Sequence, residues 1–213
     1  LEGMGFIERN CANASWRLSH LCRTLSDVYN DESWMRDCAL PEIERLGREI
    51  LWPVDLMVFQ NYRMVVREST HRFSPFSIVD GIVGTALPLL ESSGGRAWLA
   101  FCSETERQEI LKHLEEQEKE KFDRAYVNRM IAQTIEHGYA WRCKELYKET
   151  SSFSLPVYAN GRLQAVLTVV WFASAMSVAE AIRKLRDRAE VSARRISQLF
   201  DAHPDHQPTA ATR

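Results

Sequence analysis

The stretch Ser92-Ser93-Gly94-Gly95, which runs directly into "RAWLAF", has the residue types of an anion-binding turn. The apolar run predicts a short helix, and the first backbone N–H groups of a helix have no partner within it. These groups and the helix dipole attract a negative charge, and glycines let a ligand approach the backbone closely. The alternative is a Ser/Gly turn that enters a packed helix, and it is favoured because such clusters are mostly loops.

A second candidate is Arg142 in "GYAWRCKE", which lies between an expected helix and the last expected hairpin. We expect this residue near the mouth of the sheet, where its planar guanidinium could hold a carboxylate with two hydrogen bonds. The alternative is a solvated arginine paired with Glu145 or Glu149, and this ordinary interpretation is again favoured.

The sequence gives little support for catalysis or metal binding. Cys102 follows an apolar run without an identifiable His partner, which is typical of an inert core thiol. His71 and His137 lack ligand spacing, and the chain has no H-E-x-x-H, G-x-S-x-G or P-loop motif. The 5 cysteines are widely spaced without C-x-x-C, so we expect reduced thiols. We predict no catalytic residue, no cofactor and no metal site.

Composition indicates one sizeable hydrophobic core. The 213 residues are 45% hydrophobic, and the net charge of -2 argues against a surface devoted to phosphate contacts. There is no apolar run of about 18 residues and no recognisable leader, so we expect a cytoplasmic protein without a membrane partner.

The elements that must position these residues begin with a hairpin. Residues 6–9 and 15–18 read as two half-apolar strands, and two strands alone are marginal in water. Because Leu1 is not a natural initiator, we expect the chain to be a fragment. Apolar residues at helical spacing predict a connecting helix next, then a helical segment over residues 33–50 in which Pro41 marks a kink or a fresh start.

The apolar period then changes to that of strands. "VDLMVF" and "YRMVVRE" predict a hairpin connected at Gln60-Asn61, and residues 76–90 predict short strand and loop. "FSLPVY" and "LQAVLTVVW" predict a second hairpin through Asn160-Gly161, a dipeptide suited to a type I′ turn.

Helices are expected between and after these hairpins. Ser103 with Glu106, and Ser177 with Glu180, have the spacing of capping boxes. A further helix should cover residues 123–136 and end at Gly138. Long antiparallel hairpins separated by helices predict an α+β fold, not a doubly wound parallel sheet.

Three segments together resemble the isocitrate-lyase regulator (IclR) family of bacterial transcription factors: "GMGFIERN…SWRLS", "LPLLESSGGRAWLAF" and "GYAWRCKELYKETSSFSLPVYANGRLQAVLTVVW". In that family a winged helix-turn-helix binds DNA, a linker helix follows, and an effector domain with a GAF/profilin-like antiparallel sheet and flanking helices senses a small organic acid. Within the family, "WPVD", "VVRESTHRFS" and "ASAM" are most similar to activators of 3-(3-hydroxyphenyl)propionate degradation.

The resemblance implies a domain division. Residues 1–19 would be the wing hairpin of a DNA-binding domain whose remaining helices precede Leu1, and residues 20–31 the linker helix. Residues 32–201 would be the effector-binding domain, and residues 202–213 a flexible tail. Family members form dimers and tetramers, so we expect a homodimer or homotetramer that binds operator DNA.

The resemblance also implies an effector site. Phe76, Val79 and Leu87 would form its apolar wall, and Ser93 and Gly94 would meet the effector carboxylate. The complete expected set is Phe76, Val79, Leu87, Ser93, Gly94, Gly95, Arg142, Ser152, Thr168 and Val170.

Three departures from the family pattern bear on the ligand. Arg142 stands where an acidic residue is common, Val170 replaces a strand serine, and Trp171 and Phe172 replace small residues. A more apolar and more cationic pocket suits an aromatic acid better than a small keto acid, because buried apolar area contributes about 25 cal/mol per Å².

These observations predict a ligand-responsive transcriptional regulator of aromatic-acid catabolism, of the phenylpropionate type, and not an enzyme. A GAF-like sensor or small hydrolytic enzyme that does not act on DNA is the alternative from another class. A third possibility is an oligomerisation module with an empty pocket.

Overall fold

The computed structural model describes residues 2–4, 6–9, 16–19, 21, 34–77, 81–118 and 122–203. A six-stranded antiparallel sheet with strand order β5-β4-β3-β8-β7-β6 forms its centre. The strands of this sheet are β3 (Val54–Gln60), β4 (Arg63–Ser69), β5 (Ala86–Leu87), β6 (Ala140–Cys143), β7 (Thr150–Ala159) and β8 (Arg162–Phe172). The predicted α+β class with an antiparallel sheet is confirmed.

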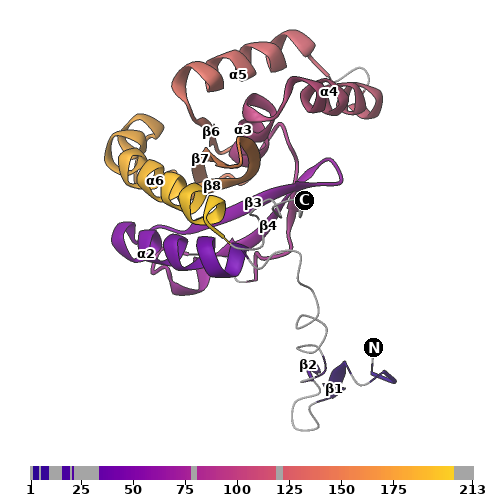
Figure 1. The fold of residues 1–213 in the computed structure, drawn as a ribbon, viewed down its shortest axis with the longest axis vertical. Helices are drawn as coiled ribbons and strands as arrows, with labels where there is room; N and C mark the ends of the chain where they lie inside the picture. The colour runs from indigo at the N-terminus through magenta and orange to yellow at the C-terminus, as the bar shows by residue number, and fades with distance from the viewer. Residues whose placement is uncertain are drawn as a thin grey trace, which may run out of the picture.

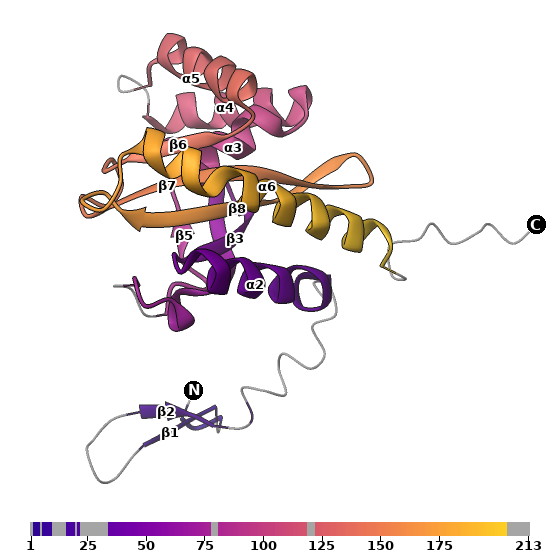
Figure 2. The ribbon, with the colours of Figure 1, turned by 90° about the vertical axis from the view of Figure 1, so that its left-hand side faces the viewer.

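Helices cover both faces of the sheet (Figures 1 and 2). α2 and α6 lie on one face, and α3, with α4 and α5 beyond it, lies on the other. The helical elements are η1 (Met35–Ala39), α2 (Leu40–Ile50), η2 (His71–Phe73), α3 (Ser93–Phe101), α4 (Glu104–Glu118), α5 (Arg124–His137) and α6 (Val178–Asp201). Pro41 lies in the first turn of α2, just after the π-helical η1, as the expected fresh start requires.

The N-terminal residues contain the predicted hairpin. β1 (Ile7–Arg9) and β2 (Trp16–Leu18) pair antiparallel, with Ile7 opposite Leu18. The expected linker helix over residues 20–31 lies outside the described residues, apart from Leu21, and so does the expected tail from residue 204 onward.

The two long hairpins differ in how closely they follow the prediction. Asn160 and Gly161 have φ of 49° and 73°, so both occupy the left-handed region that a type I′ turn requires. In the β3–β4 hairpin Gln60 pairs with Arg63, so the connection is Asn61-Tyr62, one residue later than predicted. Tyr62 adopts a φ of 58° there, and its ring stacks on His113 with centroids 3.6 Å apart.

Side-chain alternation along β7 and β8 gives the sheet two different faces. Phe153 and Leu155, with Leu167 and Val169, are buried in the core beneath α2 and α6. Ser152, Ser154 and Thr168 alternate with them and are buried on the α3 side. The α2–α6 face of these two strands is therefore apolar, while their α3 face carries hydroxyl groups beside a second apolar cluster that includes Met57, Met64 and Val166.

Local capping explains where the helices begin and end. Asp123 accepts a hydrogen bond from the Tyr126 N–H, and Gly138, with a φ of 76°, ends α5 as predicted. Ser103 and Ser177 cap their helices in the same way. Only half of the predicted capping box forms at Ser103, because the Glu106 carboxylate accepts from Trp98 Nε1 at 2.9 Å instead.

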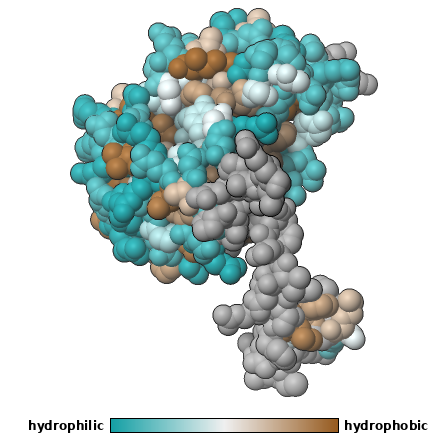
Figure 3. Space-filling model, viewed as in Figure 1, coloured by the Kyte–Doolittle hydropathy of each residue, from teal (hydrophilic) through white to brown (hydrophobic). Residues whose placement is uncertain are grey.

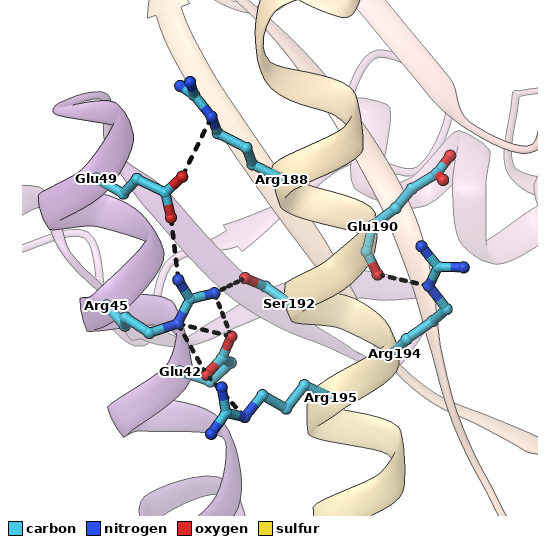
Figure 4. A network of polar contacts seen from close by, with 8 residues as sticks. All are labelled: Glu42, Arg45, Glu49, Arg188, Glu190, Ser192, Arg194 and Arg195. Atoms are coloured by element: carbon cyan, nitrogen blue, oxygen red, sulfur yellow. Dashed lines mark hydrogen bonds and ion pairs between the residues drawn. The ribbon is translucent and has the colours of Figure 1, made fainter.

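A network of charges joins α2 to α6 (Figure 4). Glu42 is only 4% exposed, and both of its oxygens accept from Arg45 at 2.7–3.2 Å. Arg45 also donates to Ser192 Oγ at 3.1 Å, and Arg195 lies 3.6 Å from Glu42. The hydrogen bond to Glu42 is the main cause of the raised pKa of Arg45. The face of the molecule seen in Figure 3 is largely hydrophilic, with small hydrophobic patches.

Candidate functional site

A cavity of about 200 Å³ lies on the α3 side of the sheet. This volume is far above the roughly 10–15 Å³ that one water molecule needs, so the cavity can hold an organic molecule. Its walls come from β3, η2 and the segment after it, β5 and its flanking segments, the start of α3, and β6 to β8. The lining residues are Pro53, Asp55, Met57, His71, Phe76, Ile82, Leu87, Ser92, Ser93, Arg142, Tyr147, Glu149, Thr150, Ser152, Thr168, Val170, Trp171 and Phe172.

Arg142 on β6 supplies a buried positive charge to this cavity. The residue is 4% exposed, and its guanidinium donates to the carbonyl oxygen and to Oγ1 of Thr150, both at 2.8 Å. It also lies 5.7 Å from the centroid of the Tyr147 ring. Burial lowers the pKa of Arg142, and the charge of Glu145 opposes that effect. The favoured prediction of a solvated arginine is therefore wrong.

The acidic residues expected to neutralise Arg142 are not paired with it. Glu145 accepts from Arg96 Nη1 at 3.2 Å and from the Cys143 N–H, and Glu149 is exposed. Within the described part of the chain, no carboxylate forms an ion pair with Arg142. The cavity thus presents a desolvated cation whose direct partners are neutral, which is an arrangement suited to an anionic ligand.

Hydroxyl groups connect the start of α3 to the sheet beside the cavity. Ser93 Oγ lies 2.7 Å from Ser152 Oγ and accepts from Ser154 Oγ at 2.8 Å. Ser154 Oγ lies a further 2.7 Å from Thr168 Oγ1. The hydroxyl groups satisfy one another, so this cluster positions α3 and gives the cavity wall a neutral polar strip.

The Ser-Gly turn is capped by a side chain and closely packed. Ser92 Oγ accepts from the Gly95 N–H at 3.0 Å and donates to the Pro88 carbonyl at 2.6 Å. Gly94 and Gly95 do not line the cavity. A Cβ on Gly94 would lie 2.8 Å from Met57 Sδ, and one on Gly95 would lie 2.2 Å from the Leu89 carbonyl oxygen. The predicted turn into a packed helix describes these glycines well, whereas Ser92 and Ser93 face the cavity.

Asp55 and His71 form a second polar group in the cavity wall. Asp55 is 0% exposed and accepts from Ser69 Oγ at 2.7 Å, and His71 is 7% exposed with Nδ1 2.6 Å from Ser77 Oγ. Asp55 Oδ2 and His71 Nε2 lie 3.7 Å apart. Within the described ranges of the chain, neither atom has a hydrogen-bond partner.

The remaining wall is apolar and partly aromatic. Phe76 stacks on Trp52 with ring centroids 4.6 Å apart, and Trp52 meets Phe172 edge-on at 5.7 Å. Trp171, expected to add bulk to the pocket, also belongs to the core beneath α6 and donates from Nε1 to the Met176 carbonyl at 3.0 Å. Aromatic and aliphatic groups thus make up much of the cavity wall, together with Arg142 and the Asp55–His71 pair.

The structure brings together most of the residues expected at the site. Phe76, Leu87, Ser93, Arg142, Ser152, Thr168 and Val170 line the cavity, and Val79 lies outside the described residues. Sequence reasoning missed Asp55, and it treated His71 as an isolated histidine. A single carboxylate inside the apolar run "VDLMVF" was the available signal, because buried charges are rare without a specific partner.

Other features give no sign of catalysis or metal binding. Burial raises the pKa of the Cys102 thiol to about 11, which makes it a poor nucleophile. Among the described residues no cluster of three or more His, Cys, Asp or Glu side chains could hold a metal ion. None of the described helices is both long and apolar enough to cross a membrane.

Comparison with known proteins yields one family. The family described as "Bacterial transcriptional regulator IclR C-terminal" matches residues 29–198. Thermotoga maritima IclR is structurally similar, with a TM-score of 0.79 and 21% identity over 94% of this chain and 82% of that chain. Pseudomonas aeruginosa HmgR gives a TM-score of 0.64 and 25% identity over 94% of this chain and 81% of that chain.

One similar structure contains an aromatic acid. An IclR homolog from Microbacterium hydrocarbonoxydans, solved in complex with 4-hydroxybenzoate, has a TM-score of 0.72 and 20% identity over 94% of this chain and 81% of that chain.

Proposed function

This chain belongs to the IclR family of bacterial transcriptional regulators, and we propose that its cavity binds an aromatic carboxylic acid as the effector that controls transcription. Regulators of this family bind small-molecule effectors and DNA, and they are not enzymes. The proposal concerns the chemical class of the effector and the residues that hold it.

The observation that carries the proposal is the burial of Arg142 without an acidic partner. A buried cation is costly unless a negative charge compensates it, and its fixed bonds to Thr150 hold the guanidinium in place. A carboxylate from the ligand would provide the missing charge through a charge-assisted hydrogen bond. The Ser93 and Ser152 hydroxyls lie in the same cavity and can support the carboxylate or the atoms next to it.

The apolar wall favours an aromatic body over a small keto acid. Phe76, Leu87, Met57, Val170 and Phe172 offer apolar surface that a two- or three-carbon acid would leave uncovered. An aromatic ring buries much more area, at about 25 cal/mol per Å². The resemblance to activators of hydroxyphenylpropionate degradation points to an acid of the phenylpropionate type and to a role in aromatic-acid catabolism.

Regulation would act by a shift between arrangements of the DNA-binding heads in a homodimer or homotetramer. The effector can bias such an equilibrium only by the difference in its affinity for the two arrangements. In this proposal the β1–β2 hairpin is the wing of the DNA-binding domain, residues 20–31 link it to the sheet, and residues 32–201 form the effector domain.

Thermal melting of the purified chain against a panel of acids tests the proposal. A ligand at 100 times its dissociation constant should stabilise the folded state by roughly 2.7 kcal/mol. We expect phenylpropanoate or cinnamate to raise the Tm and the corresponding primary amides to leave it unchanged. Glyoxylate and pyruvate control for non-specific effects of anions. No shift with any aromatic acid would contradict the proposal.

A further inference from the structure

Asp55 and His71 place two polar atoms in the cavity wall that the proposed carboxylate contact at Arg142 does not use. Each side chain is fixed through one atom, Asp55 by Ser69 and His71 by Ser77, at 2.7 Å and 2.6 Å. The other atom of each, Asp55 Oδ2 and His71 Nε2, is buried without a hydrogen-bond partner among the residues that the structure describes. Buried polar groups nearly always have a partner, so two neighbouring exceptions in a cavity wall call for an explanation.

The separation of Asp55 Oδ2 and His71 Nε2 suits a ligand group that can both donate and accept hydrogen bonds. The 3.7 Å between Asp55 Oδ2 and His71 Nε2 is too long for a direct hydrogen bond. An ionised carboxylate only accepts, and its position beside Nε2 favours the tautomer with a proton on that nitrogen. A hydroxyl group can donate to Asp55 and accept from His71 at once. A second carboxylate would be repelled by Asp55, and an ammonium group could not accept from Nε2.

The strand register places this pair at the opposite end of the cavity from Arg142. Arg142 pairs with Ser152 across β6 and β7, Ser154 pairs with Thr168 across β7 and β8, and Thr168 pairs with Asp55 across β8 and β3. Three strand spacings correspond to about 14 Å of sheet. Met57, Val170 and Phe76 lie among the apolar lining of the same cavity.

From this arrangement we infer that Asp55 and His71 bind a hydroxyl group of the effector. The inference rests on the proposed function, because it assumes that the carboxylate of the same ligand lies at Arg142. The ligand class is then an aromatic acid whose ring carries a hydroxyl group on the side away from the carboxylate. Asp55 and His71 act as specificity residues that distinguish this acid from its unhydroxylated analogue.

The test measures hydroxyl preference by calorimetry, as the ratio of the dissociation constants of phenylpropanoate and its ring-hydroxylated derivatives. For the unmodified chain we expect a preference of at least about tenfold for one hydroxylated derivative. Asp55→Asn keeps an acceptor for Ser69, and His71→Leu removes the imidazole altogether. Each should reduce the preference to below about threefold, while the affinity for phenylpropanoate itself changes little. Glu49→Gln, on the opposite face of the sheet, should keep the full preference.

The outcomes separate the two proposals. Equal affinities of the unmodified chain for phenylpropanoate and every hydroxylated derivative would overturn this inference and leave the proposed function intact. The inference would also be overturned if Asp55→Asn or His71→Leu folds and still prefers the hydroxylated acid to the same extent. Failure of all these acids to bind would remove both proposals together.

Discussion

The two faces of the central sheet treat buried polar groups in opposite ways. On the α2–α6 side, Glu42 is surrounded by Arg45 and Arg195, and Arg45 in turn reaches Ser192. On the α3 side, Arg142 has neutral partners, and Asp55 and His71 each keep an unpartnered atom. The first network is complete within the chain and joins two helices. The second lines a cavity, and in our proposal a ligand completes it, so we expect changes on the two faces to affect different properties.

The largest expected effect is on the cavity side. Arg142→Met should weaken binding of phenylpropanoate by on the order of 100-fold or more, because truncating one partner of a buried charge pair leaves the other unpaired. The free energy of unfolding of the unliganded chain should change by no more than about 1 kcal/mol, because the removed cation has no acidic partner there. Titration calorimetry and urea unfolding measure the two quantities. A variant that binds normally would remove Arg142 from the site.

Two neighbouring glycines at the start of α3 allow effects on packing and on binding to be measured separately. Gly95→Ala should lower the free energy of unfolding by about 2–3 kcal/mol, because the new Cβ meets the Leu89 backbone at 2.2–2.6 Å. Gly94→Ala meets the flexible end of Met57, so the protein should stay folded. Its displaced Met57 should instead reduce the affinity for aromatic acids several-fold. Urea unfolding of both variants measures the difference in stability. Equal destabilisation by Gly94→Ala and Gly95→Ala would contradict it.

Changes in the Glu42 network between α2 and α6 should affect stability and leave ligand binding unchanged. Glu42→Gln should lower the free energy of unfolding by about 1–2 kcal/mol, since it weakens the hydrogen bonds that hold Arg45 against α6. The dissociation constant for phenylpropanoate should remain unchanged. Urea unfolding with and without ligand measures both. A large loss of affinity would show instead that the two faces of the sheet are coupled.

The smallest effect is expected in the hydroxyl cluster. Ser152→Ala removes one neutral hydrogen bond to Ser93, so stability and affinity should each fall by about 1 kcal/mol or less. Comparison with Arg142→Met by the same calorimetric titration shows whether charge or hydroxyl contacts dominate. A loss as large as that of Arg142→Met would shift the centre of the site to the start of α3.

The features that sequence predicted well depend on local chemistry. Asn160-Gly161 determines a type I′ turn, and Gly138 ends α5, because backbone preferences act over a few residues. The α+β fold followed from hairpins and helix caps of this kind. The β3–β4 turn was displaced by one residue because the ladder pairing of Gln60 with Arg63, and not the turn residues alone, decides the register.

The features that sequence missed depend on side-chain contacts between different strands and helices. Arg142 is buried because Thr150, eight positions later, holds its guanidinium, while Arg96 of α3 binds Glu145. Asp55 and His71 approach each other only after β3 and β4 have paired. Composition and spacing do not encode such contacts, so the charge balance of the cavity emerges only from the folded arrangement.

In our proposal, this cavity recognises a carboxylate through Arg142. Calorimetric titration of the unmodified chain with phenylpropanoate and with its uncharged primary amide tests this claim most directly, because the two ligands share the same ring and chain. We expect saturable binding of the acid, with the amide weaker by on the order of 100-fold. Equal affinity for the acid and the amide would contradict it.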